Sequence, residues 1–188
     1  MPELIAVVDT ETTYQNTLMS VGIVIADGET LCPRTEAYYI LSPEFLIGGI
    51  YSSALNPRGV PVTGICLRKQ ATDGIRALLA ANGVRDIFAY NARFDRALLP
   101  ELTGNGEVWH DIMAVAAYRQ FNRFLPEDGD YCRTGRLRRD YGAEQMLRLA
   151  SGERYYVELH NALTDARDEL RLMRLLGVPV GQYEKLKE

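Results

Sequence analysis

The order of apolar and polar stretches along the chain predicts strands first and helices later. Apolar runs occupy residues 4–8, 18–26 and 35–41; the second is rich in Val and Ile, and the third carries Tyr38 and Tyr39. Such residues favour strands. Asp27-Gly28 follows the second run and is a turn signal. Three strands joined by short links indicate an antiparallel meander.

The pattern changes after residue 41. Residues 42–72 are rich in Gly and Pro, which predicts a loop-rich connection with room for one short helix. Beyond it, the sequence predicts an alternation of helices and short strands. The expected helices are 73–82, 93–99, 112–123, 143–150 and 161–176, the expected strands are 86–90 and 107–110, and 125–141 is expected to be irregular.

This element order predicts an α/β domain with a mixed five-stranded sheet, in which a three-stranded antiparallel meander is joined by parallel strands and flanked by helices. The length of 188 residues fits a single domain. We expect its core to span residues about 4–177 and to leave a short C-terminal tail, residues 178–188.

Composition narrows the class of protein. Hydrophobic residues make up 47% and charged residues 24%, so a packed core is expected. No apolar run approaches the ~20 residues of a membrane helix, and the first residues lack the features of a secretory signal. These patterns predict a cytoplasmic protein without a membrane partner. Three scattered cysteines favour neither disulfides nor a zinc site.

The overall charge argues against a strongly basic nucleic-acid binder. The formal net charge is -4 and the pI is about 5.3. A nucleic-acid substrate would therefore need local basic patches or metal ions to offset the overall sign. Arginines before residue 143 offer one such patch, for which phosphate binding and a solvated polar loop are equally open interpretations; they are Arg133, Arg136, Arg138 and Arg139.

Three segments carry carboxylates at strand ends or helix starts. In the first, Asp9 and Glu11 are two residues apart after an apolar run, so their side chains point to one side of an extended chain. Two such carboxylates repel each other unless a cation neutralises them. A polar turn at the end of a strand is the alternative interpretation.

The second segment begins with Asn91, which suits a helix N-cap, and contains Asp95 four positions later on the same side of the helix. A simple capped helix, with Phe94 in the core and Asp95 favouring the helix dipole, is the favoured interpretation of this segment taken alone.

In the third segment, the helical spacing of Ala162 and Ala166 places Asp165 at the edge of a buried face. The same helical spacing places Asp168 further from the buried face, on the side exposed to solvent. His160 would point to the opposite side if it were helical, so it must lie in the preceding loop to reach the same site as Asp165.

Together these segments resemble the DEDD-type 3′→5′ exonucleases of the ribonuclease H-like superfamily, in the subclass with a catalytic histidine (DEDDh). The motifs that carry the resemblance are DTET, NARFD and HNALTDA. The subclass includes the proofreading exonucleases of DNA polymerases, and the chain is similar to that of DNA polymerase III. Tyr14 and Tyr90 depart from the commonest pattern, where Gly and His often stand.

The resemblance implies a two-metal site and its roles. Asp9 would bridge two Mg²⁺ or Mn²⁺ ions, Glu11 and Asp165 would complete the site of one ion, and Asp95 would hold the other largely through water. His160 would be the general base that takes a proton from the attacking water. The four acids supply four negative charges, which two divalent cations would neutralise.

The resemblance also implies a substrate and partners. The substrate would be the 3′ end of single-stranded DNA or RNA, with DNA favoured, and a polymerase or another replication or repair protein is a candidate partner. Candidates for contact with the terminal nucleotide are Thr10, Thr12 and Asn91. Asp111 is expected to start a helix outside the metal site.

Other functions remain open to different degrees. A catalytically silent ribonuclease H-like binding domain is disfavoured, because it has no reason to keep four repelling carboxylates and His160. An exoribonuclease that trims RNA is not separated from a DNA exonuclease by these motifs. A zinc hydrolase lacks His and Cys ligands at suitable spacing.

Overall fold

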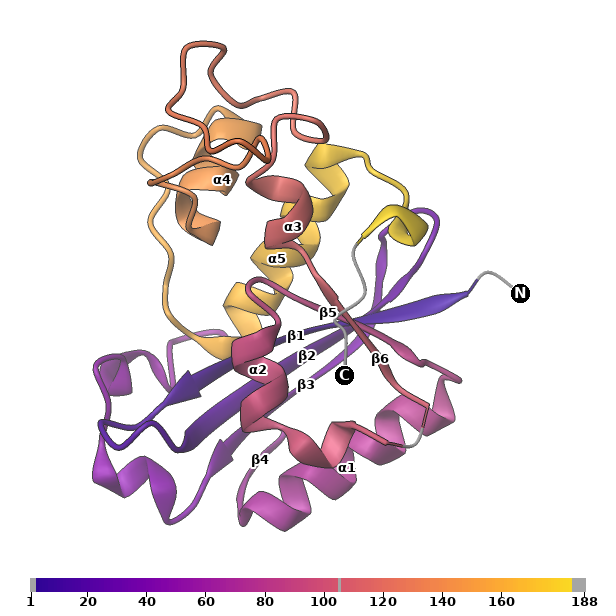
Figure 1. Cartoon of the computed structure of the whole chain (residues 1–188). Helices are drawn as coiled ribbons and strands as arrows, with labels where there is room; N and C mark the ends of the chain where they lie inside the picture. Colours follow the sequence, from indigo (N-terminus) through magenta and orange to yellow (C-terminus); the bar gives the residue numbers. More distant parts are fainter. Residues whose placement is uncertain (1–2, 105, 184–188) are drawn as a thin grey trace.

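A computed structural model describes residues 3–104 and 106–183 and shows one mixed sheet covered by helices on both faces (Figure 1). The strand order is β4-β3-β2-β1-β5-β6. β1 and β2 pair antiparallel, as do β2 and β3, whereas β5 lies parallel to β1 and β6 parallel to β5. The strands are β1 (Leu4–Thr12), β2 (Leu18–Asp27), β3 (Pro33–Leu41), β4 (Gly64–Cys66), β5 (Asp86–Ala89) and β6 (Val108–Asp111).

The meander and the parallel strands are confirmed, but the prediction of five strands is wrong. The additional strand, β4, lies in the linker expected to be loop-rich, and it pairs in parallel with the end of β3. Its three residues are too short for a period-2 pattern to be recognised. The same linker also holds two short 3₁₀ helices, η1 (Glu44–Ile47) and η2 (Ser52–Ala54).

The remaining helices follow the predicted order with two clear differences. They are α1 (Arg68–Ala81), α2 (Arg93–Leu98), η3 (Pro100–Leu102), α3 (Met113–Ala116), α4 (Ala143–Ser151), α5 (Ala162–Leu176) and η4 (Val180–Gln182). α1 begins five residues before the predicted start at 73, because the Gln70 side chain accepts the backbone N–H of Leu67 and Arg68 pairs with Glu101 at 2.8 Å.

The predicted helix 112–123 is wrong beyond its first turn. After α3 the backbone bonds instead to the following irregular segment: the Leu137 N–H donates to the carbonyl of Ala117, and the Arg119 N–H to that of Gly135. The side chain of Asn122 also donates to the Ala116 carbonyl at 2.7 Å. These long-range bonds satisfy groups that a helix would have used, and they build a lobe from residues 117–151 beside the sheet.

The two faces of the sheet bury different side chains of the same strands. In β1, Ile5 and Val7 belong to the apolar cluster under α4 and α5, whereas Ala6 and Val8 belong to the cluster under α1. Because successive side chains of a strand point to opposite faces, a continuous apolar run is the pattern of a strand covered on both sides. β1 is therefore a central strand, and Asp9 lies where it leaves the core.

A glycine in β2 allows α5 to begin directly on the sheet. Gly22 pairs with Asp9 across the β1–β2 ladder. A Cβ atom at Gly22 would lie 2.3 Å from the backbone carbonyl of Ala162, which is too close for any side chain at this position. The first turn of α5, with the loop before it, is thereby held against the strand pair that carries Asp9 and Glu11.

The described part of the expected C-terminal tail, 178–183, packs against the core, and the remainder of the tail lies outside the described residues. Tyr183 is only 3% exposed, and its ring meets that of Phe88 edge-on at 5.4 Å. Hydrophobic burial thus joins this segment to the core. Among the described residues, no helix has both the length and the apolar character required to cross a membrane.

Candidate active site

A cavity of about 580 Å³ opens at the carboxyl end of β1. It is formed by residues from the end of β1, the start of α2, the segment around Tyr51 and the loop before α5. The lining residues are Asp9, Thr10, Glu11, Thr12, Thr13, Tyr14, Asn16, Ile50, Tyr51, Asn91, Phe94, Glu158, His160 and Asp165. Segments far apart in the sequence therefore meet here.

β1 delivers the first two acids to the cavity. Asp9 and Glu11 both line it, as expected for residues two apart on a strand. Between them, the Thr10 hydroxyl donates to Asp95 Oδ1 at 2.7 Å. Thr10, predicted to touch substrate, thus also fixes the orientation of an acid on α2. Thr12 lines the cavity and is half-buried.

α2 presents Asp95, but its start differs from the prediction. Asn91 is not an N-cap: it is exposed, has a φ of 61°, and its backbone N–H donates to Asp111 Oδ1 at 3.0 Å. The N-cap position falls to Ala92. This left-handed turn leaves Phe94 46% exposed at the cavity rim, so the expectation that Phe94 is core is wrong, while Asp95 is 2% exposed.

Asp111 starts the helical turn after β6, as expected. Its Oδ1 accepts the backbone N–H of Met113 at 3.0 Å in addition to that of Asn91. The carboxylate is therefore used as a backbone acceptor. It ties the end of β6 to the turn that precedes α2.

The third segment places His160 and Asp165 as predicted. Asn161 caps α5 by accepting the Thr164 N–H at 3.2 Å, so His160 lies in the preceding loop, with a φ of 56°. The His160 ring stacks on Tyr51 with centroids 3.7 Å apart. Asp165 is 3% exposed in the first turn of α5.

The expectation that Asp168 is solvated is wrong. This side chain is half-buried, and its Oδ2 accepts the Tyr156 hydroxyl at 2.5 Å. The helical pattern could not show this contact, because the loop before α5 covers that side of the helix.

Three of the predicted residues offer ligand atoms to one point. One atom each from Glu11, His160 and Asp165 lie within 4.8 Å of one another. Among the described atoms, Asp9 Oδ2 and Asp165 Oδ1 are buried without a hydrogen-bond partner. Buried carboxylate oxygens that lack a donor are costly unless a cation binds them. Hard oxygen donors of this kind fit Mg²⁺ or Mn²⁺.

Burial and the charges of neighbouring acids favour the protonated form of these carboxyl groups in the absence of a cation. Burial, and then the charges of neighbouring acids, raise the pKa of Glu11 to about 8 and that of Asp165 to about 9. Burial likewise raises the pKa of Asp95 to about 7, and it raises that of Asp9 well above its ordinary value. Repulsion and desolvation of this size are the signature of a site built for positive charge.

Two acids and one aromatic residue of this region were not found from the sequence. Glu158 lines the cavity, and its Oε2 lies 3.9 Å from His160 Nδ1. Glu169 is 4% exposed, and of the neighbouring charges its carboxylate has the largest effect on the pKa of Asp9. Its position four residues after Asp165, on the same helix face, could have indicated it. Nothing in the local pattern marks Glu158 or Tyr51, because both lie in irregular segments.

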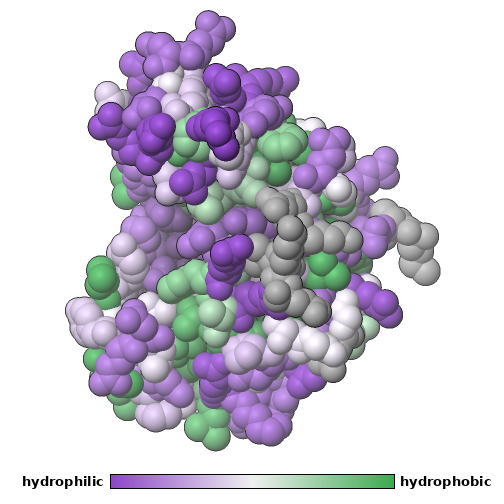
Figure 2. All heavy atoms as spheres, in the orientation of Figure 1, coloured by the Kyte–Doolittle hydropathy of each residue, from purple (hydrophilic) through white to green (hydrophobic). Residues whose placement is uncertain are grey.

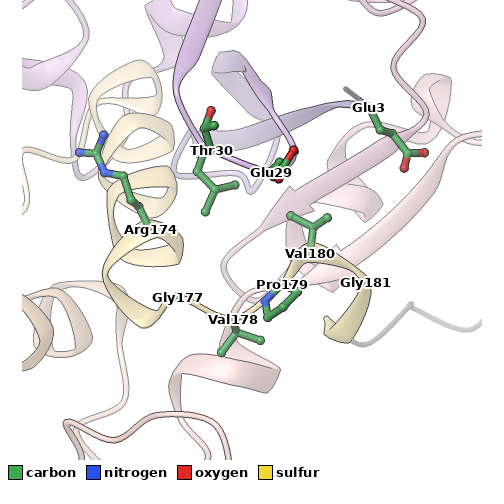
Figure 3. A pocket seen from close by; sticks show the side chains of 11 residues that line it. Glu3, Glu29, Thr30, Arg174, Gly177, Val178, Pro179, Val180 and Gly181 are labelled. Atoms are coloured by element: carbon green, nitrogen blue, oxygen red, sulfur yellow. The ribbon is translucent and has the colours of Figure 1, made fainter. Parts of the chain in front are cut away.

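A second cavity, of about 530 Å³, lies at the other end of β1 and α5 (Figure 3). It is bordered by the turn at residues 28–31 and the chain after α5, with Glu3, Glu29 and Arg174 among its lining residues. The lining residues that the structure describes include neither His nor Cys. This cavity therefore lacks the grouping of ligand atoms seen at the end of β1.

Solved exonucleases share this fold. E. coli Exonuclease I in complex with a dT13 oligonucleotide is 15% identical, with a TM-score of 0.60 over 93% of this chain and 40% of that chain. The Exonuclease I of Methylocaldum szegediense is 19% identical, with a TM-score of 0.59 over 92% and 40%. A 3′-exonuclease that recognises the histone mRNA stem-loop is 14% identical, with a TM-score of 0.64 over 99% and 71%.

At these identities the comparison establishes the fold. The predicted ribonuclease H-like α/β class is confirmed, with the added strand β4. This chain spans about 40% of the length of the two Exonuclease I chains. No family model matches the sequence, and no curated protein matches it.

Proposed function

We propose that this chain is a 3′→5′ exonuclease that depends on divalent cations and hydrolyses single-stranded nucleic acid from its 3′ end. The observation that carries the proposal is the meeting of Glu11, His160 and Asp165 within 4.8 Å. They meet in a cavity that Asp9 also lines. At 14–19% identity the shared fold alone does not transfer the activity of the larger solved proteins to this chain.

The proposed site holds two divalent cations, Mg²⁺ or Mn²⁺. Asp9, Glu11, Asp95 and Asp165 would bind them, and the buried oxygens without donors support this assignment. When bound, the cations supply positive charge that stabilises the attacking and leaving oxygens of a phosphodiester. The Thr10 hydroxyl holds Asp95 in place through its 2.7 Å hydrogen bond.

His160 is the proposed general base. It lines the cavity beside Glu11 and Asp165, and it reaches the cavity from the loop outside α5. Burial lowers the pKa of His160, so the ring is neutral and able to accept a proton from the attacking water near pH 7. Stacking on Tyr51 restrains the ring while it does so.

The cavity has room and chemistry for a terminal nucleotide. Tyr14, Ile50 and Phe94 are exposed apolar side chains that line it, and they suit the faces of a base. Thr12 and the exposed Asn91 are the proposed polar contacts. Both DNA and RNA strands are candidates, because the solved proteins with this fold include an Exonuclease I with a dT13 oligonucleotide and an enzyme that recognises histone mRNA.

The proposed cellular setting follows the resemblance to proofreading exonucleases. A polymerase or another replication or repair protein remains the candidate partner, and a cytoplasmic location remains a prediction. Kinship with the proofreading exonuclease of DNA polymerase III in particular also stays a prediction, which motifs such as DTET support.

The proposed function is tested by the need for a free 3′ end. With Mg²⁺ or Mn²⁺, we expect release of mononucleotides from the 3′ end of a labelled single strand, and protection when that end is blocked. Matched DNA and RNA strands identify the preferred sugar. Cleavage inside a blocked strand would make the protein an endonuclease. A protein that binds Mn²⁺ in calorimetry but releases no nucleotide would contradict the proposal, and one that binds no Mn²⁺ would be a silent binding domain.

The raised pKa values predict an unusual dependence of stability on pH. Glu11 and Asp165 bind protons more tightly in the folded chain than in the unfolded one, with folded pKa values of about 8 and 9. Their contribution to stability is therefore full below the unfolded pKa of about 4 and is lost as the pH rises toward 9. We expect the melting temperature of the metal-free protein to fall between about pH 5 and pH 9.

Added Mn²⁺ or Mg²⁺ should reverse this fall. At a cation concentration of about 100 times the dissociation constant, binding adds about 2.7 kcal/mol, or about 5–10 °C for a chain of this size. Thermal denaturation across pH with EDTA or with Mn²⁺ measures both effects. A metal-free melting temperature that rises toward pH 9, or no cation-dependent shift at pH 8, would contradict the assignment of the cluster.

A further inference from the structure

The loop that delivers His160 has a regular inner and outer face. Residues 155–160 run from the end of the lobe to the start of α5 (Figure 1). Tyr155, Val157 and Leu159 are 95%, 69% and 44% exposed, whereas the residues between them are less exposed and face inward. We call these three apolar residues the outer stripe. The inner residues are Tyr156, Glu158 and His160.

The inner face is firmly attached to both neighbouring helices. From α4, Arg148 Nε donates to the Tyr156 carbonyl at 2.6 Å, and the Glu144 carboxylate accepts the Glu158 N–H at 2.8 Å. From α5, Asp168 accepts the Tyr156 hydroxyl at 2.5 Å. The outer stripe is therefore displayed by an anchored backbone, and its exposure does not come from a loosely attached loop.

Exposed apolar groups on an anchored surface mark contact sites. The loop that bears the stripe also borders the candidate active site, because its inner residues Glu158 and His160 line the cavity, whereas the three stripe residues are not among the lining residues. A molecule that enters the cavity and continues along the loop toward the lobe would lie on the stripe. The space-filling view shows the molecule narrowing between the lobe and the body that contains the sheet (Figure 2).

Positive charge is available at the far end of the stripe. Arg154 is exposed next to Tyr155 and makes no ion pair with any described residue. In the lobe, Arg138 and Arg139 form ion pairs with the surface residue Asp130 at 3.1 and 3.7 Å, and Arg138 Nε also donates to the Tyr131 carbonyl at 3.3 Å. Such surface pairs are weak and can be exchanged for phosphate contacts. Apolar and aromatic surface followed by arginine matches the bases and phosphates of a single strand.

We propose that the outer stripe of Tyr155, Val157 and Leu159 binds the nucleotides that lie 5′ to the cleaved bond, with Tyr155 as the stacking residue and Arg154 as a phosphate contact. This inference rests on the proposed function and adds to it a route for the strand outside the cavity. It commits to single-stranded nucleic acid, because the loop that carries the stripe borders the cavity and has at its other end the exposed Arg154, which forms no ion pair with any described residue.

Strand length is the variable that tests the route. A trinucleotide has little chain beyond the cavity, so only a longer strand, of about 12 nucleotides, is expected to reach Tyr155. For Tyr155→Ala, we expect the KM of the long strand to rise about 5–10-fold while its kcat and the KM of the trinucleotide stay within about twofold. Tyr155→Phe keeps the ring and should behave as wild type. Ile65→Ala, at a 59% exposed apolar residue on β4, is the control for loss of surface apolar area.

Each other outcome overturns the route. An equal rise in KM for both lengths would show that Tyr155 shapes the cavity, and no change for either length would leave the stripe for a protein partner. A wild-type protein that releases no nucleotide from any strand would refute the proposed function and this inference together. A wild type that is active, beside a Tyr155→Ala variant unchanged on long strands, would refute the inference alone.

Discussion

Replacing Asp9 with asparagine is expected to abolish nuclease activity and cation binding together. Asp9 lies at the end of β1 with its Oδ2 buried and without a described hydrogen-bond partner. The amide keeps the shape of the side chain but removes the negative charge that would hold a cation. The bound cations would stabilise the transition state by several kcal/mol, so their loss predicts a fall in kcat/KM of about 10³-fold or more. Single-turnover assays and Mn²⁺ calorimetry measure the two losses.

The same variant should make the metal-free protein more stable. Burial and the charges of Glu169, Asp95 and Asp165 raise the pKa of Asp9. Asparagine requires neither a buried charge nor the uptake of a proton at this position, so the melting temperature in EDTA should rise at pH 8. An inactive but destabilised Asp9→Asn protein would point instead to a structural role for Asp9.

Asp27→Asn is the matched control at the other end of the sheet. The N–H groups of Glu29 and Thr30 donate to Asp27 Oδ1 at 3.1 and 2.9 Å, and these bonds lower its pKa. Its charge is thus stabilised by the fold, and removal should lower the melting temperature. Activity should remain, because Asp27 is remote from the cavity. Retained activity in Asp9→Asn, in contrast, would overturn the assignment of the whole site.

The acids could be predicted from the sequence because each sits where local pattern and position in the fold agree. An apolar run buried on both faces must end at a polar residue, and Asp9 is that residue. The helical period of α5 likewise places Asp165 on a buried face, where the structure leaves it 3% exposed. Such residues are determined by periodicity, which a single sequence displays.

The surroundings of the acids could not be predicted in this way. Tyr51 meets His160 by stacking across more than a hundred residues of sequence, and β4 forms only because β3 offers it an edge. The exposure of Phe94 depends on the left-handed turn at Asn91, which the Asp111 carboxylate supports through a long-range hydrogen bond. These features arise from tertiary contacts that compete with local preference, so local pattern assigns them incorrectly or not at all.

The structure also explains why the acidic pI does not exclude a nucleic-acid substrate. Four acids line one cavity, namely Asp9, Glu11, Glu158 and Asp165, and the buried Asp95 and Glu169 lie close enough to Asp9 to raise its pKa. Cations bound there would offset a large share of the negative charge. The arginines of the lobe lie on a different part of the surface and remain available to phosphate. The local distribution of charge therefore favours binding where the total charge opposes it.

His160→Ala is expected to slow catalysis strongly while leaving the cation site largely intact. Loss of a general base reduces kcat by about 10²–10⁴-fold. If His160 is the base, the rise in melting temperature on adding Mn²⁺ should be preserved, because the carboxylates remain. The wild-type rate should also fall as the pH drops below the lowered pKa of His160, and this limb of the pH profile should be absent in the variant.

The second histidine of the chain supplies the control. His110 is buried under Tyr183 and bonds to Asp86 at 2.6 Å, on the far side of β5 from the cavity acids. His110→Asn should lower the melting temperature but keep kcat within about threefold, since no proton transfer is assigned to it.

One atom of His160 lies within 4.8 Å of ligand atoms from Glu11 and Asp165, so a role as metal ligand is the rival explanation. An equal loss of Mn²⁺ stabilisation and of kcat in His160→Ala would establish that rival and refute the general base.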